Sequence, residues 1–304
     1  MPSEVTMPSL EETANRQALW SSTANKLKAN YDRARKVTFA LSIAAALLAT
    51  VASQLEGAPR LYLSVTSAVL LGLVSFLSAR LLSSARTSAW VRARAGSEAL
   101  KREGFKFAAS AAPYDDPATR DDRLNHEREK IERDLDDLLG EVVPAPGKGS
   151  VPRSPLPPER YIETRVRDQA EKFYEPKAET YRRAASALRT AEFGLSLVAA
   201  VITAAVGVAG KELFGLRFDF VALTAVLTTI AGAILAHIEA SRYDFLVMTY
   251  RGAARRLRNE LAHRPPAAPA EWSAFINRCE AIILEENNGW VAKWSAPTSS
   301  SPAT

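Results

Sequence analysis

The stretch that decides the fold is Val37-Thr-Phe-Ala-Leu-Ser-Ile-Ala-Ala-Ala-Leu-Leu-Ala-Thr-Val-Ala-Ser-Gln-Leu55, which holds no Asp, Glu, Lys or Arg. Three further stretches share this property: 61–79, 193–210 and 220–238. A helix rises about 1.5 Å per residue, so each stretch could cross roughly 27–29 Å, the thickness of a bilayer core. A soluble core helix rarely lacks charge around its whole circumference for so long. We therefore predict an all-α membrane protein with four spans in two tandem helical hairpins, each span continuing into long helical extensions.

Basic residues crowd the outer flanks of these hairpins and are sparse at their tips. The first flank alone contains Arg33, Arg35 and Lys36, whereas the basic residues of both tips are Arg60, Lys211 and Arg217. Positive loops stay on the cytoplasmic side, so we expect both termini and the central region there. The net charge of +5 and pI of about 9.3 thus reflect membrane topology, and no nucleic-acid motif accompanies them. The predicted partner is the lipid bilayer, and no nucleic acid.

Catalytic and metal-binding motifs are missing from the sequence. Cys279 is its single cysteine, which excludes an internal disulfide and agrees with a reducing cytoplasm. No Gly-rich phosphate loop, GxSxG or HExxH occurs. We therefore expect a protein that is not an enzyme and has no cofactor or metal.

The chain reads as an internal duplication. Phe39-Ala-Leu-Ser-Ile-Ala-Ala-Ala aligns with Phe193-Gly-Leu-Ser-Leu-Val-Ala-Ala. The same plan of basic helix, span, short tip, span and basic helix occurs twice. We predict a first module at 1–140, a Pro-rich linker at 141–158, a second module at 159–296 and a disordered tail at 297–304.

The positions of proline predict long helices that leave the membrane. One helix is expected from about Leu10 through the first span, because no proline interrupts it. A second helix is expected from Pro59 as far as Glu103. The second copy repeats this pattern between Pro176 and Pro265.

Two amphipathic helices are predicted outside the spans, at 121–139 and at about 270–294. Apolar residues recur on one face of each at spacings of three and four. Either face could drive assembly of several chains or pack back on its own module, and the sequence leaves both open. The residues proposed for interaction are Leu124, Ile131, Leu135 and Leu138 in the first helix, and Phe275, Ile276, Glu280, Ile283, Glu286, Asn287 and Trp290 in the second.

Polar residues within the spans are few. Four serines share one face of the second span: Ser64, Ser67, Ser75 and Ser78. They would either line a pore or allow close helix packing, since small hydroxyl residues let helices approach, and packing is the favoured reading. His237 lies at the cytoplasmic end of the fourth span, where it would either gate a pore or mark the interface, the more common role.

The closing run Phe275-Ile-Asn-Arg-Cys-Glu-Ala-Ile-Ile-Leu-Glu-Glu-Asn-Asn-Gly-Trp290 resembles the end of one subtype of the SLATT superfamily, a set of bacterial two-span membrane modules. The recurring residues correspond to Glu280, Glu286-Asn287 and Trp290. The resemblance covers most of the chain as two tandem modules, although the N-terminal copy lacks this ending.

This resemblance implies a function that the residues alone do not. SLATT modules are regarded as pore-forming effectors of bacterial conflict systems, often encoded beside enzymes that synthesise or proteins that sense nucleotide second messengers. The resemblance implies an effector in the bacterial inner membrane, with a trigger that comes from a cytoplasmic nucleotide-sensing or nucleotide-synthesising partner or from a site in the helical region. Because the spans carry little polarity, a pore would need several chains, and we expect a homo-oligomer. The alternative is a membrane scaffold that recruits a cytoplasmic partner and conducts nothing.

Overall fold

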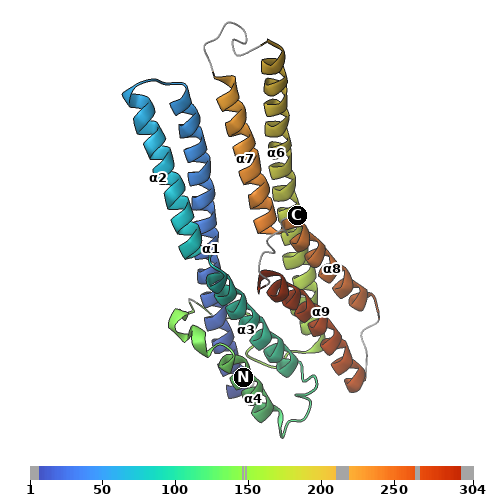
Figure 1. The fold of residues 1–304 in the computed structure, drawn as a ribbon. Coiled ribbons are helices and arrows are strands. Elements are labelled where there is room, and N and C mark those ends of the chain that lie inside the picture. Colours follow the sequence, from blue (N-terminus) through green and yellow to red (C-terminus); the bar gives the residue numbers. More distant parts are fainter. Residues whose placement is uncertain (1–6, 146, 148, 210–218, 264–267, 296–304) are drawn as a thin grey trace, which may run out of the picture. The chain divides into compact units, whose positions relative to one another are not determined.

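The computed structural model describes residues 7–145, 147, 149–209, 219–263 and 268–295. These residues form helices, turns and loops, and no strand occurs among them, which confirms the all-α prediction (Figure 1). The elements are α1 (Pro8–Ser53), α2 (Ala58–Leu81), α3 (Ser84–Ala108), α4 (Arg120–Arg133), the 3₁₀ turn η1 (Asp136–Glu141), α5 (Pro158–Tyr161), the π-helix η2 (Ile162–Tyr174), α6 (Glu175–Ala209), α7 (Phe220–Ser241), α8 (Tyr243–Ala262) and α9 (Pro269–Ser295).

The chain folds into two compact units that cut across its two sequence halves. The membrane unit consists of Tyr31–Ser83 and Glu179–Val247, and the extramembrane unit of Met1–Asn30, Ser84–Ala178 and Met248–Thr304. Each sequence half contributes one hairpin to the membrane unit and further helices to the other unit. The division into modules at 1–140 and 159–296 concerns the sequence repeat and stays a prediction.

The membrane unit is built from four apolar helix segments, in α1, α2, α6 and α7. Each is long and apolar enough to cross a bilayer, so the protein is multi-pass. Figure 1 shows α1 and α7 lying between α2 and α6. Phe39 of α1 faces His237 of α7 with ring centroids 4.9 Å apart, and Arg35 donates to Ser241 Oγ at 2.5 Å. The two hairpins therefore meet along their α1 and α7 helices.

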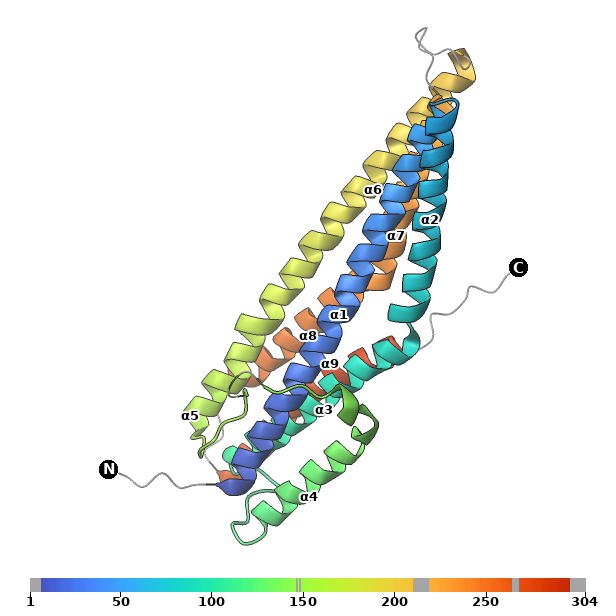
Figure 2. The same ribbon diagram turned by 90° about the vertical axis from the view of Figure 1, so that its left-hand side faces the viewer.

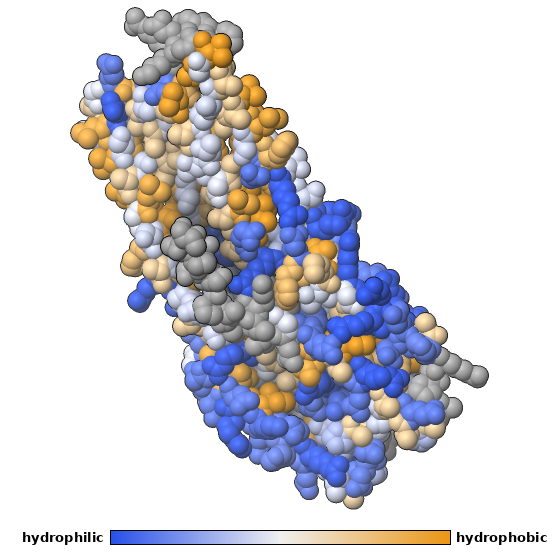
Figure 3. All heavy atoms as spheres, turned by 45° about the vertical axis from the view of Figure 1, so that its right-hand side comes forward, coloured by the Kyte–Doolittle hydropathy of each residue, from blue (hydrophilic) through white to orange (hydrophobic). Residues whose placement is uncertain are grey.

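The interior of the membrane unit holds mostly small or apolar side chains, although Thr38, Ser67 and Ser241 are also buried there. Its buried residues include Ala45 and Ala52 on α1, and Ala231 and Ile234 on α7. Large apolar side chains such as Leu61, Phe76 and Phe193 are exposed on α2 and α6. On the face that Figure 3 draws, hydrophobic residues predominate over this unit and hydrophilic residues over the other. This distribution is typical of helices solvated by lipid.

The second span of each hairpin ends sooner than we predicted. The expectation of one helix as far as Glu103 is wrong, because α2 ends at Leu81 and α3 begins at Ser84. In the second copy, α7 ends at Ser241 and Arg242 takes a left-handed conformation with φ of 52°. Serine lies at both breaks, and the Ser241 hydroxyl donates to the His237 carbonyl at 2.6 Å. Such side-chain bonds compete with the helical backbone.

The first span of each hairpin does continue outward. Helix α1 is unbroken from Pro8 to Ser53, as predicted. The helical path into the third span runs from Pro158 through η2 and α6. Figure 2 shows the length of both helices in a second view.

The predicted helix at 121–139 is too long. Helix α4 ends at Arg133 and the chain continues as η1. Asp134, Asp136 and Asp137 follow, and acidic residues oppose the negative end of a helix dipole. The apolar stripe nevertheless packs within the chain: Leu124 lies against Phe107 and Tyr114, and the second cluster contains Trp20, Leu100, Ile131, Leu135 and Leu138.

The Pro-rich linker belongs to the extramembrane unit and packs against α1 and α3. The Ser150 amide donates to Gln17 Oε1 at 3.1 Å, and the Val143 amide donates to Thr23 Oγ1 at 3.2 Å. Val151 is buried, and a Cβ on Gly104 of α3 would lie 2.4 Å from its Cγ1. Residues 146 and 148 lie outside the described chain. Glycine at 104 thus allows the linker to approach α3 closely.

Helix α9 agrees with the predicted range of about 270–294. It packs along α3 and buries Phe275, Ile276 and Ile283. The side chains of Asn287 and Trp290, and the tail at 297–304, lie outside the described residues. The predicted apolar face of α9 therefore packs inside this chain wherever it is described.

Candidate functional site

The four serines predicted to share one face of α2 differ in how far they are buried. Ser67 is buried, and its hydroxyl donates to the Ala45 carbonyl of α1 at 2.8 Å. Ser64 and Ser75 are exposed on the surface of the chain, and Ser78 is half-buried. At Ser67 the hydroxyl supports helix packing. A lining role for Ser64 and Ser75 stays a prediction.

His237 is half-buried near the end of α7. Its ring lies between Phe39, at 4.9 Å between centroids, and Tyr243, at 6.5 Å. These contacts position the ring where α1 meets α7. The gating role predicted for His237 stays a prediction.

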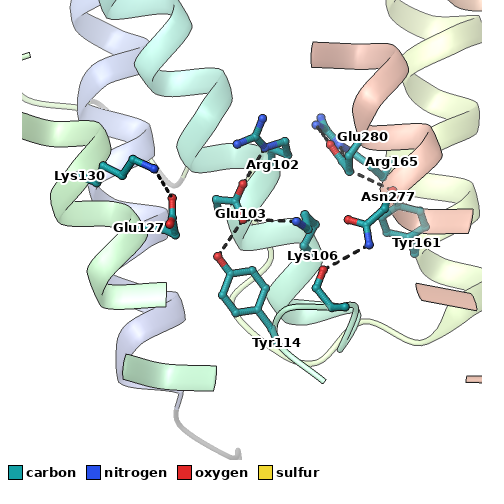
Figure 4. Close-up of polar contacts among 11 residues, drawn as sticks. Arg102, Glu103, Lys106, Tyr114, Glu127, Lys130, Tyr161, Arg165, Asn277 and Glu280 are labelled. Carbon is teal, nitrogen blue, oxygen red and sulfur yellow. Dashed lines mark hydrogen bonds and ion pairs between the residues drawn. The ribbon is translucent and has the colours of Figure 1, made fainter. Parts of the chain in front are cut away.

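A buried ion pair joins η2 to α9. Arg165 donates from Nε and Nη2 to the two carboxylate oxygens of Glu280, at 2.8 and 2.7 Å, and both side chains are at most 2% exposed (Figure 4). The Tyr161 hydroxyl donates to the same carboxylate at 3.1 Å. The ring of Phe105 on α3 lies 4.7 Å from the guanidinium carbon. Two parallel bonds and an aromatic face fix the guanidinium in a single orientation.

The π-helical conformation of η2 brings Arg165 to this position. Besides Val166, the buried residues of this segment are Tyr161, Arg165, Ala170 and Tyr174, which are spaced by four, five and four. An α-helix would place Tyr161 and Ala170 on opposite sides. A π-helix, with about 4.4 residues per turn, places all four on one face.

Glu103 forms a second buried cluster at the far end of α3. Arg102 Nε and the Tyr114 hydroxyl donate to its two oxygens, at 2.7 and 2.8 Å, and Lys106 lies 3.7 Å away (Figure 4). Burial and the Glu103 carboxylate raise the pKa of Tyr114. Each oxygen of this carboxylate has a donor, so the cluster is a satisfied structural contact.

Glu286 of α9 is half-buried beside another carboxylate. Tyr174 of η2 donates to it at 3.3 Å, and Glu98 and Arg94 of α3 act on it electrostatically. Burial and the Glu98 charge raise the pKa of Glu286 to about 7, although Arg94 and the Tyr174 hydrogen bond oppose the shift. Glu286 thus exchanges its proton near neutral pH.

This shift predicts a pH dependence of stability. Because the folded state holds this proton above the ordinary pKa of 4.5, the stabilising effect is complete below about pH 4.5 and is lost as the pH rises through about 7. The thermal midpoint of the wild type should therefore fall between pH 5 and 8 relative to that of Glu286→Gln. The control is Glu285→Gln, because Glu285 is 63% exposed and pairs with Arg256. Parallel curves for the wild type and Glu286→Gln would contradict the prediction.

Among the described residues, no group of three or more His, Cys, Asp or Glu side chains is placed to hold a metal ion. Cys279 is buried, and burial raises the pKa of its thiol to about 12. A thiol with such a pKa is a poor nucleophile at neutral pH.

The two halves of the chain match two different family models. Residues 161–290 match SMODS and SLOG-associating 2TM effector domain 1. Residues 161–290 are a SLATT domain. Residues 18–122 match a model described as a protein of unknown function, DUF4231, a related two-span type. No curated protein and no solved structure matches the chain.

The SLATT domain begins at Tyr161, so it contains both partners of the buried ion pair. Glu280 belongs to the closing run that resembles the end of a SLATT module, and its partner in the structure is Arg165. Sequence reasoning missed Arg165. The available signal was an arginine four residues after Tyr161 in a helical run that ends in Phe173 and Tyr174.

Proposed function

We propose that this protein is a non-enzymatic effector that permeabilises or depolarises a bacterial inner membrane, acting as an oligomer. The observation that carries the proposal is the SLATT domain at residues 161–290, whose family description is a two-span effector domain. The multi-pass fold and the scarcity of charge in its spans support a role within the bilayer.

The distribution of basic residues supports a single orientation. The flanks of all four spans on the side away from the hairpin tips are rich in Arg and Lys, and the tips are not. By the positive-inside rule the extramembrane unit and both termini are cytoplasmic. This unit is then available to a cytoplasmic nucleotide-sensing or nucleotide-synthesising partner, which we propose as the trigger.

The interior of the membrane unit supports a pore formed between chains. Ala45, Ala231 and Ile234 are apolar, and the buried hydroxyls of Thr38, Ser67 and Ser241 are bonded to backbone carbonyls. A water path through one chain would therefore meet few free polar groups. The exposed serines of α2, Ser64 and Ser75, lie on the outside of the chain. Polar groups on an outward face would line a path only when several copies surround it.

The test is membrane potential in bacteria, measured with a voltage-sensitive dye during titrated expression. We expect the wild type to depolarise the cells, and Ser64→Leu with Ser75→Leu to reduce depolarisation at least about tenfold, because an apolar constriction excludes water. Val69→Leu is the matched control, since Val69 is 63% exposed on another face of the same helix. Ser67 is left intact because it packs against α1.

Equal depolarisation by the serine variant and the wild type would contradict a lining on α2. A stable potential with abundant wild-type protein in the membrane would favour the scaffold, which recruits a partner without conducting. Recruitment by the serine variant should then equal that of the wild type.

A further inference from the structure

The two hairpins of the membrane unit meet through unlike spans: α1 is the first span of one hairpin, and α7 is the second span of the other. At one end of this contact Phe39 lies against His237. At the other end the Asp219 N–H donates to Gln54 Oε1 at 2.8 Å, and Gln54 Nε2 donates to the Asp219 carbonyl at 3.3 Å. Contacts between α1 and α7 are therefore present at both ends of the spans.

The order of the helices shows how the hairpins are related. In Figures 1 and 2, α1 and α7 lie between α2 and α6, so the order is second span, first span, second span, first span. A two-fold axis between the hairpins would instead pair like spans in the middle, α1 with α6 or α2 with α7. A contact between unlike spans is heterologous, and it leaves one unlike face open at each edge. The open edges are α2 and α6.

The two edge helices are less buried than their counterparts in the sequence repeat. In the most apolar stretch of each helix, 22% of the residues are buried in α1 and α7, against 6% in α2 and α6. The four stretches are nevertheless alike in mean hydropathy, at 1.7 to 2.0. Since α6 is the counterpart of α1, and α2 that of α7, each edge helix lacks the neighbour that its counterpart has.

The first open edge, α6, repeats the α1 residues that contact α7. Arg35-Lys-Val-Thr-Phe39 on α1 aligns with Arg189-Thr-Ala-Glu-Phe193 on α6, so an arginine and a phenylalanine four residues later recur. Phe39 is half-buried beside α7, whereas Phe193 is 66% exposed. Phe193 therefore has the position of a contact residue without the contact.

The second open edge, α2, matches α7 in the same way. The two helices align at their last residues, Leu81 and Ser241, and in this alignment the single glycine of each helix also coincides. The counterpart of His237 is then Leu77, which is half-buried beside Phe76, a residue that is 62% exposed. This end of α2 thus presents an apolar surface at the level of the contact that α7 makes within the chain.

We propose that copies of this chain assemble head to tail in the membrane, with α6 of one copy packed on α2 of the next and Phe193 placed near Leu77. This contact repeats between chains the step that joins α1 to α7 within one chain. A repeated heterologous step closes into a ring or continues as a filament. The inference rests on the oligomer of the proposed function and specifies its contact, and its test does not depend on conduction.

The experiment is cysteine cross-linking of the full-length protein in bacterial membranes, with a short bifunctional thiol reagent and denaturing electrophoresis. The native Cys279 is buried, so the wild type gives the background. The double variant Phe193→Cys, Leu77→Cys should give a ladder of dimers and larger species. Its yield should exceed that of either single variant at least about tenfold, because a heterologous contact joins two different faces.

Two further variants calibrate this result. Phe39→Cys with His237→Cys should cross-link within one chain and give no ladder, which shows that the reagent spans a contact of this kind. Phe193→Cys with Leu61→Cys is the mismatched control. Leu61 is also 62% exposed but lies near the opposite end of α2, so this variant should stay monomeric.

Two outcomes would overturn the proposal. Dimers formed by Phe193→Cys alone would place α6 against α6, which is a two-fold contact. Monomers from the double variant, beside an efficient cross-link between positions 39 and 237, would leave both edges facing lipid. Depolarisation by cells whose chains form no ladder would likewise count against this contact alone. A ladder without depolarisation would support the head-to-tail contact and contradict the proposed function.

Discussion

Replacing Glu280 by glutamine is expected to destabilise the protein by about 3–5 kcal/mol, which is the cost of removing one partner of a buried ion pair. The change leaves the Arg165 guanidinium charged, 1% exposed and without its counterion. It also weakens the acceptor of the Tyr161 hydroxyl. Because these contacts join η2 to α9, the loss should fall on the contact between these two elements.

The measurement is the free energy of unfolding of the full-length protein in detergent, from denaturant titration followed by tryptophan fluorescence. The matched control is Glu163→Gln, which removes an exposed i,i+4 ion pair with Arg167 and should change stability by less than about 1 kcal/mol. The double variant Arg165→Met, Glu280→Leu should recover most of the loss, since it leaves no buried charge. If Glu280→Gln and Glu163→Gln lowered the free energy of unfolding equally, the buried ion pair would not stabilise the protein as we expect.

Replacing Leu138 by alanine is expected to destabilise the protein by about 2–5 kcal/mol, because it opens a cavity in a packed core. Leu138 lies in η1 and is buried with Trp20 of α1 and Leu100 of α3. The prediction decides between the two roles that the sequence left open for this stripe. Loss of a core residue lowers the free energy of unfolding of a single chain. Loss of a residue at a contact between chains weakens association instead.

The neighbouring residue provides the control. Leu139 is 55% exposed, so Leu139→Ala should change the free energy of unfolding by less than about 0.5 kcal/mol. Both variants would be compared by denaturant titration and by size-exclusion chromatography. A Leu138→Ala protein of unchanged stability but altered oligomeric size would show that the residue serves assembly.

Features that depend on neighbours in the sequence were predictable. The four spans follow from runs without charge, and α9 follows from an apolar face at regular spacing that includes Phe275, Ile276 and Ile283. The length of α1 follows from the lack of proline between Pro8 and Pro59. In each case the pattern is local, and helix geometry converts it directly into a structure.

Features that depend on competing local interactions were predicted wrongly. The breaks at Leu82 and Arg242, and the change from α4 to η1, interrupt stretches without proline or glycine. At such positions the helix competes with serine hydroxyls or with acidic residues at its end, and the energy differences are small. Packing of the following segment then decides where the helix stops.

The amino-acid sequence by itself determined that this chain crosses a membrane in two hairpins, because a charge-free helix of that length has no better solvent than lipid. It also indicated the SLATT domain through the closing run of α9. Only the tertiary structure decided that the leucine stripe is internal and that Glu280 meets Arg165, 115 residues away. Such contacts depend on the π-helical register of η2 and on which helices become neighbours, and no local pattern in the chain encodes either one.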